Sequence, residues 1–283
     1  MTALRDRMVD AMVLRGFAAR TQMSYVAAVR GLARYTHQAP DTLSADEVQG
    51  YLLHLIRDKK LAYASVNQAS CACRFLFREV LGRHDPAFDI PMAKVPKHLP
   101  RVLSRGEVYR LLEAAPNLRA RTLLKITYAA GLRVSEVCDL KVSDIESAPD
   151  RMCLKVRDGK GGKDRYTLLS PCLLEALREY WRAARPKEWL FPNSSGDGPI
   201  SINCAQRWYG AARDAAGLGK EGGIHSLRHA FATHLLESGV DLPTLQRLLG
   251  HGHISTTMRY LHLAQSHLTA TVSPLDLLKP TLH

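Results

Sequence analysis

A run of prolines divides this chain into an N-terminal and a C-terminal part. The four prolines are Pro86, Pro91, Pro96 and Pro100. Because a proline removes a backbone donor and disrupts a helix, this stretch is expected to hold no helix, and it has little apolar surface to bury. At 283 residues the chain also exceeds a typical single domain. The sequence therefore predicts domains over 1–90 and 104–264, a linker over 91–103 and a C-terminal tail over 265–283.

The first domain has the pattern of a helical bundle. Apolar residues recur near helical spacing from Leu14 to Leu32, and another apolar stripe covers 65–81. Between them, Ser44-x-x-Glu47 has the form of a capping box that opens a helix over 48–56. Four helices are expected, and they carry the basic residues Arg15, Arg20, Arg30, Arg34, Lys59, Lys60, Arg74 and Arg78. These residues fit either an ordinary solvated surface or a surface that faces nucleic acid.

The second domain combines helices with a short β-hairpin. Ser104-x-x-Glu107 forms another capping-box pattern, and an apolar helix over 122–130 ends at Gly131. Two β-type runs, 152–157 and 165–169, flank a glycine-rich turn that carries Lys160 and Lys163. Further helices are expected over 171–183, 203–216, 226–238, 242–249 and 256–263. The predicted fold class is mainly α with a small β-hairpin or sheet.

The overall charge narrows the choice of partner. The formal net charge of +12 implies a polyanion, because excess lysine and arginine attract phosphates and displace their counterions. No apolar run approaches the ~20 residues of a membrane span, and no secretory signal is present, so a cytoplasmic protein without a membrane partner is expected. The six cysteines include no C-x-x-C pair and are interpreted as reduced thiols.

Two basic clusters near the C-terminus indicate a phosphate site. His225 and Arg228 stand three residues apart at the start of a predicted helix, so both should project from one face beside backbone N–H groups that favour an anion. His251 follows Gly250, and nine residues later Tyr260 lies in a helix expected to be capped by Ser255. A tyrosine with an unperturbed pKa near ~10 can attack at neutral pH only if its proton is removed or cations stabilise the phenolate.

Upstream motifs supply more charge to the same site. Gly131-Leu-Arg133-Val-Ser-Glu136 adds an arginine, and the glycine-rich turn adds Lys160. Two arginines, a lysine and two imidazoles suit a phosphorane transition state. The lysine turn lacks the Ser/Thr and the helix of a nucleotide-binding loop, and no carboxylate or cysteine completes a metal set around the histidines, so neither a cofactor nor a metal is expected. His229 is expected to support the helix or the wall of the site by hydrogen bonding.

Four motifs together carry a resemblance to a known family. They are G-L-R-V-S-E, G-K-G-G-K-D-R, H-S-L-R-H, and L-G-H followed nine residues later by tyrosine. In this combination and order, the chain resembles the tyrosine recombinases, or phage-integrase-type site-specific recombinases, and most nearly their compact Xer-type members. The resemblance spans nearly the whole chain, and it implies an N-terminal helical domain that binds core DNA and a mixed catalytic domain.

The resemblance also implies a role for each motif residue. Arg133 and Arg228 would hold the non-bridging phosphate oxygens, and Tyr260 would be the nucleophile. Lys160 would protonate the leaving 5′ hydroxyl, although Lys163 lies on the same turn and is the alternative. His225 would act as an acid, base or positioning group, His251 would hydrogen-bond the phosphate, and Glu136 would orient the site.

The implied reaction is cleavage of one strand of double-stranded DNA to a 3′-phosphotyrosyl linkage, followed by strand exchange through a Holliday junction without a nucleotide. The implied assembly is a synaptic tetramer, in which the tail over 265–283 either passes to a neighbouring protomer or docks on its own. A type IB topoisomerase and a DNA-binding regulator without catalysis are the alternative functions. Integration, excision and dimer resolution all remain open as biological roles.

Overall fold

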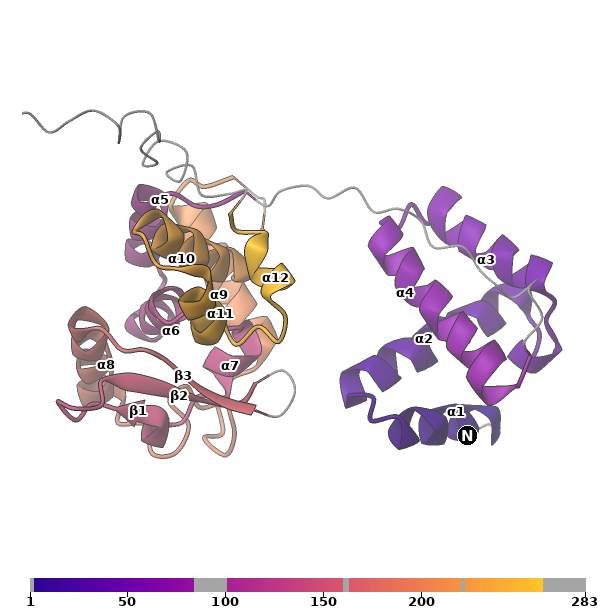
Figure 1. The fold of residues 1–283 in the computed structure, drawn as a ribbon, viewed down its shortest axis with the longest axis horizontal. Helices are drawn as coiled ribbons and strands as arrows, with labels where there is room; N and C mark the ends of the chain where they lie inside the picture. The colour runs from indigo at the N-terminus through magenta and orange to yellow at the C-terminus, as the bar shows by residue number, and fades with distance from the viewer. Residues whose placement is uncertain (1–2, 84–100, 160–162, 220–221, 262–283) are drawn as a thin grey trace, which may run out of the picture. The chain divides into compact units, whose positions relative to one another are not determined.

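The computed structural model describes residues 3–83, 101–159, 163–219 and 222–261 and divides the chain into two compact units, Met1–His98 and Leu99–His283 (Figure 1). Most of the predicted linker and the whole predicted tail lie outside the described residues. The boundaries expected from the prolines and the docking of the tail therefore stay predictions.

The N-terminal unit is a set of helices around two adjoining apolar clusters. The capping box predicted at Ser44 is present, since Glu47 N–H donates to Ser44 Oγ at 3.3 Å and Ser44 N–H donates to the Glu47 carboxylate at 2.8 Å. Buried residues such as Leu32 and Phe77 fill the space between helices. The elements are α1 (Ala3–Leu14), α2 (Ala19–Thr36), the 3₁₀ turn η1 (Pro40–Thr42), α3 (Ala45–Arg57), α4 (Tyr63–Arg74) and the π-helical turn η2 (Phe75–Val80).

In the described part of the second unit, the helices α5 to α12 lie around an apolar core. Ser104 caps the first of them through a capping box with Glu107, as the sequence predicts, and Asp241 caps α11 by accepting from Thr244 N–H at 2.8 Å. The helices are α5 (Arg105–Glu113), α6 (Leu118–Ala129), α7 (Val134–Cys138), α8 (Pro171–Ala184), α9 (Ile202–Ala215), α10 (His225–Glu237), α11 (Leu242–Leu249) and α12 (Ile254–Met258), with the 3₁₀ turn η4 at Val142–Asp144.

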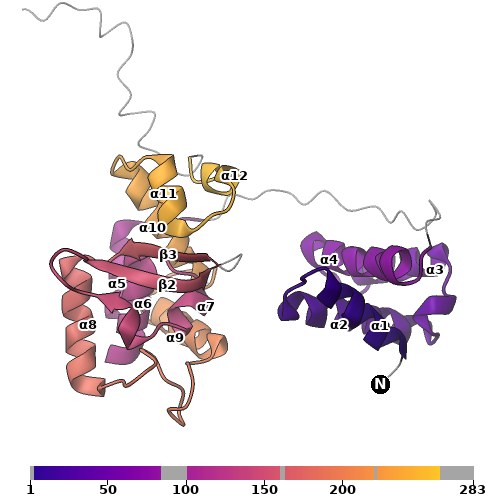
Figure 2. The ribbon, with the colours of Figure 1, turned by 60° about the horizontal axis from the view of Figure 1, so that its bottom comes forward.

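A three-stranded antiparallel sheet stands beside these helices, with the strand order β1 (Ile145–Glu146), β2 (Cys153–Gly159) and β3 (Lys163–Leu168) (Figure 2). Leu154 pairs with both Ile145 and Thr167. The hairpin of β2 and β3 is confirmed, whereas β1 was not predicted, because two residues are too few to show an alternating pattern. β3 also packs against α11, which brings the hairpin to the C-terminal helices.

The last helix differs from its prediction. It covers Ile254–Met258, so it begins and ends earlier than the expected 256–263, and its N-cap is His253 instead of Ser255. The reason is that His253 has the extended backbone of a cap and already accepts the N–H of Thr256 at 3.1 Å, which places Ser255 inside the helix. Tyr260 consequently follows the helix, in a turn closed by its own N–H on the Thr257 carbonyl at 3.0 Å.

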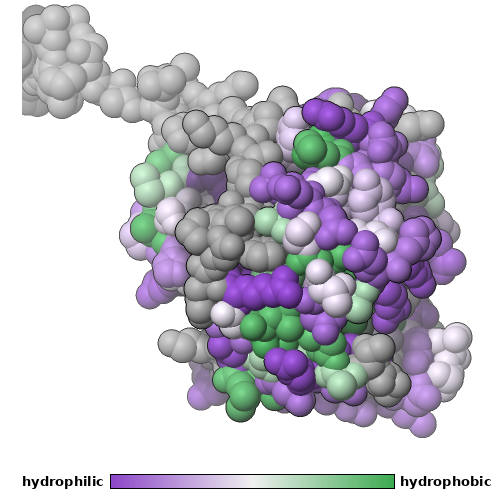
Figure 3. Space-filling model, turned by 90° about the vertical axis from the view of Figure 1, so that its right-hand side faces the viewer, coloured by the Kyte–Doolittle hydropathy of each residue, from purple (hydrophilic) through white to green (hydrophobic). Residues whose placement is uncertain are grey.

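The mainly helical fold with a small sheet is the predicted fold class. One large apolar cluster joins α5 to α10 and the sheet, and a smaller cluster contains Phe231, Leu245, Leu249 and Tyr260. Within the described residues, no helix is long and apolar enough to cross a membrane. The face drawn in Figure 3 shows mostly hydrophilic residues around a smaller apolar group.

Candidate active site

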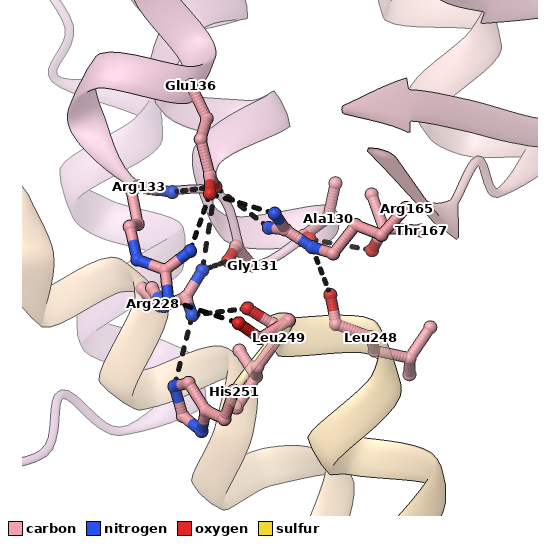
Figure 4. Close-up of polar contacts among 11 residues, drawn as sticks. Ala130, Gly131, Arg133, Glu136, Arg165, Thr167, Arg228, Leu248, Leu249 and His251 are labelled. Carbon is pink, nitrogen blue, oxygen red and sulfur yellow. Dashed lines mark hydrogen bonds and ion pairs between the residues drawn. The ribbon is translucent and has the colours of Figure 1, made fainter. Parts of the chain in front are cut away.

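One carboxylate organises three arginines from distant parts of the second unit (Figure 4). Arg133 is the N-cap of α7, and its N–H and Nη1 donate to Glu136 at 2.7 and 2.6 Å. Arg165 on β3 adds two parallel bonds of 2.8 Å, one to each carboxylate oxygen. Arg228 on α10 lies 3.6 Å from the same carboxylate. Three positive charges and one negative charge therefore meet at one place, and the excess positive charge remains for a bound anion.

The ionised state of Glu136 is strongly favoured. Burial by itself would raise the pKa of this carboxyl, but the hydrogen bonds and charge of Arg165, the Arg133 N–H and the charge of Arg228 outweigh it and lower the pKa to about 2. Glu136 is thus an ionised carboxylate in contact with three arginines, and the orienting role that the resemblance implies for it stays a prediction.

Arg228 is more enclosed than the sequence indicated. Its side chain is 1% exposed, and it donates to the carbonyl of Gly131 at 2.7 Å and to that of Leu249 at 2.6 Å. Burial and the nearby arginines lower its pKa to about 10, so it remains charged at neutral pH. Arg228 is enclosed because α10 buries residues around most of its circumference.

Two glycines of the motifs are required by these close approaches. Gly131 has φ +62°, and a Cβ there would collide with the ring of Phe231. Gly250 also has φ +62°, and a Cβ there would lie 2.6 Å from Cδ of Arg165. Glycine is the residue that tolerates both the left-handed backbone and the missing space. The two glycines therefore allow the carbonyls of Gly131 and Leu249 to approach Arg228 closely enough to accept its hydrogen bonds.

His251 is fixed in one tautomer by its two neighbours. Its Nε2 lies 3.1 Å from Nη2 of Arg228, and its Nδ1 lies 2.9 Å from Oγ1 of Thr257. A guanidinium only donates, so Nε2 accepts and Nδ1 carries the proton that is donated to Thr257. Burial, followed by the charges of Arg228 and other arginines, lowers the pKa of His251 to about 4, and the ring is neutral at pH 7.

Tyr260 is buried against two histidines. Its side chain belongs to the smaller apolar cluster, and the residue is only 2% exposed. Its hydroxyl lies 3.1 Å from Nδ1 of His229, while its ring is parallel to that of His251 at 6.3 Å between centroids. Burial raises the pKa of Tyr260, and the charges of Arg228, Arg259 and Arg133 oppose that rise. The phenol is therefore protonated at neutral pH but lies in a cationic field.

The structure brings together most of the predicted site residues. Arg133, Glu136, Arg228, His251 and Tyr260 are connected by the contacts above. His225 stands exposed at the first position of α10, with its ring 4.9 Å from that of His229 in an edge-to-face arrangement. Lys160 lies outside the described residues, so the choice between Lys160 and Lys163 stays a prediction. No group of three potential metal-binding side chains occurs in the described part of the chain.

One contributor, Arg165, was not assigned to the site from the sequence, and another, His229, was given only a supporting part. Arg165 appeared only as the last letter of the glycine-rich motif, although it makes the two parallel bonds to Glu136 and a third bond to the Leu248 carbonyl at 3.0 Å. His229 was expected to support the wall by hydrogen bonding, and its partner is the Tyr260 hydroxyl itself. The spacing of His225 and His229 along one helix face was the available signal for the second contributor.

Comparisons with known proteins agree with this site and fold. Residues 101–267 match the phage integrase family, and residues 4–86 match the N-terminal SAM-like domain of phage integrases. A Sinorhizobium fredii protein that bears the name integrase/recombinase y4qK is 46% identical over 279 residues, which are 98% of this chain and 90% of that protein. Tyrosine recombinase XerA of Thermococcus kodakarensis is 37% identical, with coverage of 90% of this chain and 89% of that protein.

A solved structure shares the fold across both units. The crystal structure of a lambda integrase dimer bound to a core site has a TM-score of 0.74 and covers 90% of this chain and 96% of its own, at 23% identity. The fold class, the family match over most of the second unit and the XerA likeness over nearly the full length lead to one assignment. The chain belongs to the phage integrase family and is a tyrosine site-specific recombinase with compact Xer-type relatives.

Proposed function

We propose that the protein cleaves one strand of duplex DNA through Tyr260 and rejoins it to a partner strand. The supporting observation is that Arg133, Arg228, His251 and Tyr260, from four separate segments, meet around one charged cluster. The Tyr260 oxygen attacks the phosphorus, the bond to the 5′ oxygen breaks, and a 3′-phosphotyrosyl ester and a free 5′ hydroxyl result. Attack by a 5′ hydroxyl from the partner duplex reverses these steps and completes the exchange.

The arginines stabilise the charge that develops on the phosphate during attack. Arg133 and Arg228 hold the non-bridging oxygens, and their positions are set beforehand by Glu136 and by backbone carbonyls. Preorganised donors of this kind are usually a large part of catalysis, because no further rearrangement is needed as charge appears. In this proposal the negative charge of a bound phosphate favours the imidazolium form of His251, in which Nδ1 keeps its bond to Thr257 and Nε2 donates to the phosphate instead of accepting from Arg228.

The leaving group receives its proton from Lys160 in this proposal, with Lys163 as the alternative, and His225 assists as an acid, base or positioning group. No nucleotide or metal is involved in the scheme, because the energy of the broken phosphodiester is retained in the tyrosyl ester. Because one phosphate ester bond forms for each one that breaks, the reaction is reversible, and an exchange between two duplexes requires this.

In this proposal DNA is the polyanionic partner that the net charge of +12 indicates. In the N-terminal unit, Arg20, Arg30, Arg34, Lys59 and Lys60 are exposed and available to phosphates. The full reaction takes place in a synaptic tetramer on two duplexes and passes through a Holliday junction. We place it in the cytoplasm, where a chromosome, a plasmid or a mobile element supplies the sites for integration, excision or dimer resolution.

A suicide substrate tests the proposal. A nick next to the cleavage site lets the short 5′-hydroxyl fragment leave, so the covalent protein–DNA adduct accumulates and is seen as a denaturation-resistant band. The wild-type protein should form the adduct, Tyr260→Phe should form none, and Tyr109→Phe should behave as wild type because Tyr109 is 68% exposed and outside the site. DNA binding with no adduct from the wild type would instead indicate a regulator.

A second arm separates the recombinase from a topoisomerase. Labelled duplexes that carry the site should yield recombinant products when two are mixed. Relaxation of a supercoiled plasmid with no recombinant product under any ratio of protein to site would favour the type IB topoisomerase reading.

A further inference from the structure

We propose that His229 is a catalytic residue that accepts the proton of the Tyr260 hydroxyl during strand cleavage. This inference rests on the proposed role of Tyr260 as the nucleophile. It adds a second histidine of the H-S-L-R-H motif to the reaction, beside His225, and it gives the attacking oxygen a defined proton acceptor.

The geometry singles out His229 among the histidines of the described site. Its Nδ1 lies 3.1 Å from the Tyr260 oxygen, within the range in which a base can take a proton directly. His251 faces the tyrosine differently, because its ring is parallel to the phenol and both of its nitrogens are engaged by Arg228 and Thr257. The ring of His225 packs edge-to-face against that of His229, with 4.9 Å between centroids, and His225 precedes His229 on α10 by about one helical turn.

The surroundings of His229 keep its ring neutral, so that it can accept a proton. Burial, then the positive charges of His225, Arg228 and Arg259, lowers its pKa to about 4, so the ring is neutral at pH 7. These groups, with Tyr260 itself, are the titratable and charged neighbours that act on it from α10 and from the segment after α12. A bound phosphate brings negative charge close to this ring, and that charge favours the imidazolium formed when the proton arrives.

The step balances without any other reactant. The O–H bond of Tyr260 breaks and its proton moves to Nδ1 of His229, while the freed electron pair forms the bond to phosphorus. The bond from phosphorus to the 5′ oxygen breaks, and that oxygen takes a proton from the general acid. On rejoining, His229 returns its proton to the tyrosyl oxygen as the ester bond breaks, which restores both side chains.

The main test is His229→Asn in single-turnover cleavage of the suicide substrate. The Asn side chain can still hydrogen-bond the phenol but cannot take its proton, so it separates orientation from proton transfer. We expect adduct formation at pH 7 to slow by about 10²- to 10⁴-fold. The slow rate should rise tenfold per pH unit, since attack then depends on the small fraction of phenolate. His253→Asn is the matched control, because His253 is exposed and its side chain caps nothing.

A substrate with sulfur in place of the 5′ bridging oxygen locates the defect. A thiolate leaves without protonation, so this substrate should rescue a variant of the general acid but leave His229→Asn slow. Rescue of His229→Asn by sulfur would assign His229 to the leaving group and overturn the proposal. A His229→Asn rate within threefold of wild type, with an unchanged pH profile, would also overturn it.

The wild-type pH profile provides a test that does not depend on the folding of any variant. If His229 takes the proton, the cleavage rate should level off once the imidazole is neutral. A wild-type rate that keeps rising tenfold per unit through pH 9 would show that the phenolate forms without His229. A wild-type protein that makes no adduct at any pH would refute the nucleophile itself, and that outcome is distinct from a failure of His229 alone.

Discussion

Replacing Glu136 by glutamine should destabilise the second unit by about 3 kcal/mol at pH 7. The pKa of this carboxyl is about 2 in the folded protein against an ordinary value of 4.5, and each tenfold preference for the ionised form is worth about 1.4 kcal/mol. The side chain is 6% exposed, so solvent screens the interaction little. Glutamine keeps the shape but leaves three guanidinium groups without a counter-charge.

The direction of the pH dependence follows from the lowered pKa. Because the unfolded chain binds the proton more readily, Glu136 contributes its full stabilisation above pH 4.5, and the contribution is lost as the pH falls toward 2. Glutamine does not titrate. The difference in stability between the wild type and Glu136→Gln should therefore be about 1.4 kcal/mol smaller at pH 3.5 than at pH 7.

Urea unfolding followed by tryptophan fluorescence measures this difference in the stability of the second unit. All three tryptophans, Trp181, Trp189 and Trp208, lie in the second unit. Glu113→Gln is the matched control, because the Glu113 side chain is 45% exposed and its ion pair with Arg121 is long, at 3.8 Å. This substitution should change the free energy of unfolding by less than about 0.5 kcal/mol. Parallel pH profiles for the wild type and Glu136→Gln would show that Glu136 does not hold the arginines as described.

Two further substitutions probe the contacts on either side of this carboxylate. Arg165→Lys removes the paired bonds to Glu136 and the bond to the Leu248 carbonyl, so we expect the free energy of urea unfolding to fall by about 2 kcal/mol. Adduct formation should be slower, while DNA affinity in a filter-binding assay should be unchanged. Weaker DNA binding in step with slower cleavage would contradict this prediction. Thr257→Val removes the acceptor of the His251 Nδ1 proton and should lower the free energy of unfolding by about 1–2 kcal/mol. The ¹⁵N chemical shifts of His251 should then lose the pattern of a protonated Nδ1. An unchanged pattern would refute the tautomer.

The sequence was informative where contacts are local. Capping boxes at Ser44 and Ser104 and the spacing of Arg133 and Glu136 fall within one helical turn, and each appears as expected. Helical periodicity also placed His225 and Arg228 on a common helix. The motif order then supplied the family, because four motifs in one order are far more specific than any one of them.

The contacts that the sequence did not reveal span long separations. Arg165 meets Glu136 across 29 positions, and it reaches the Leu248 carbonyl across 83, so only the docking of β3 against α11 shows that it belongs to the site. Periodicity likewise cannot tell which way Arg228 points when α10 is apolar on most sides. The end of α12 was misplaced because a five-residue helix offers too little pattern to locate its cap.

The order of the reacting groups along the chain bears on how the protein is made. Arg133, Arg228, His251 and Tyr260 are translated in that sequence, and the N-terminal helices with their exposed arginines emerge before all of them. Under the proposed function, a growing polypeptide would therefore hold the arginines proposed to contact DNA well before it holds the tyrosine proposed to cleave it. With Tyr260 as the proposed nucleophile, a copy whose synthesis stops before that residue would be unable to cleave DNA, however well the rest of it folds.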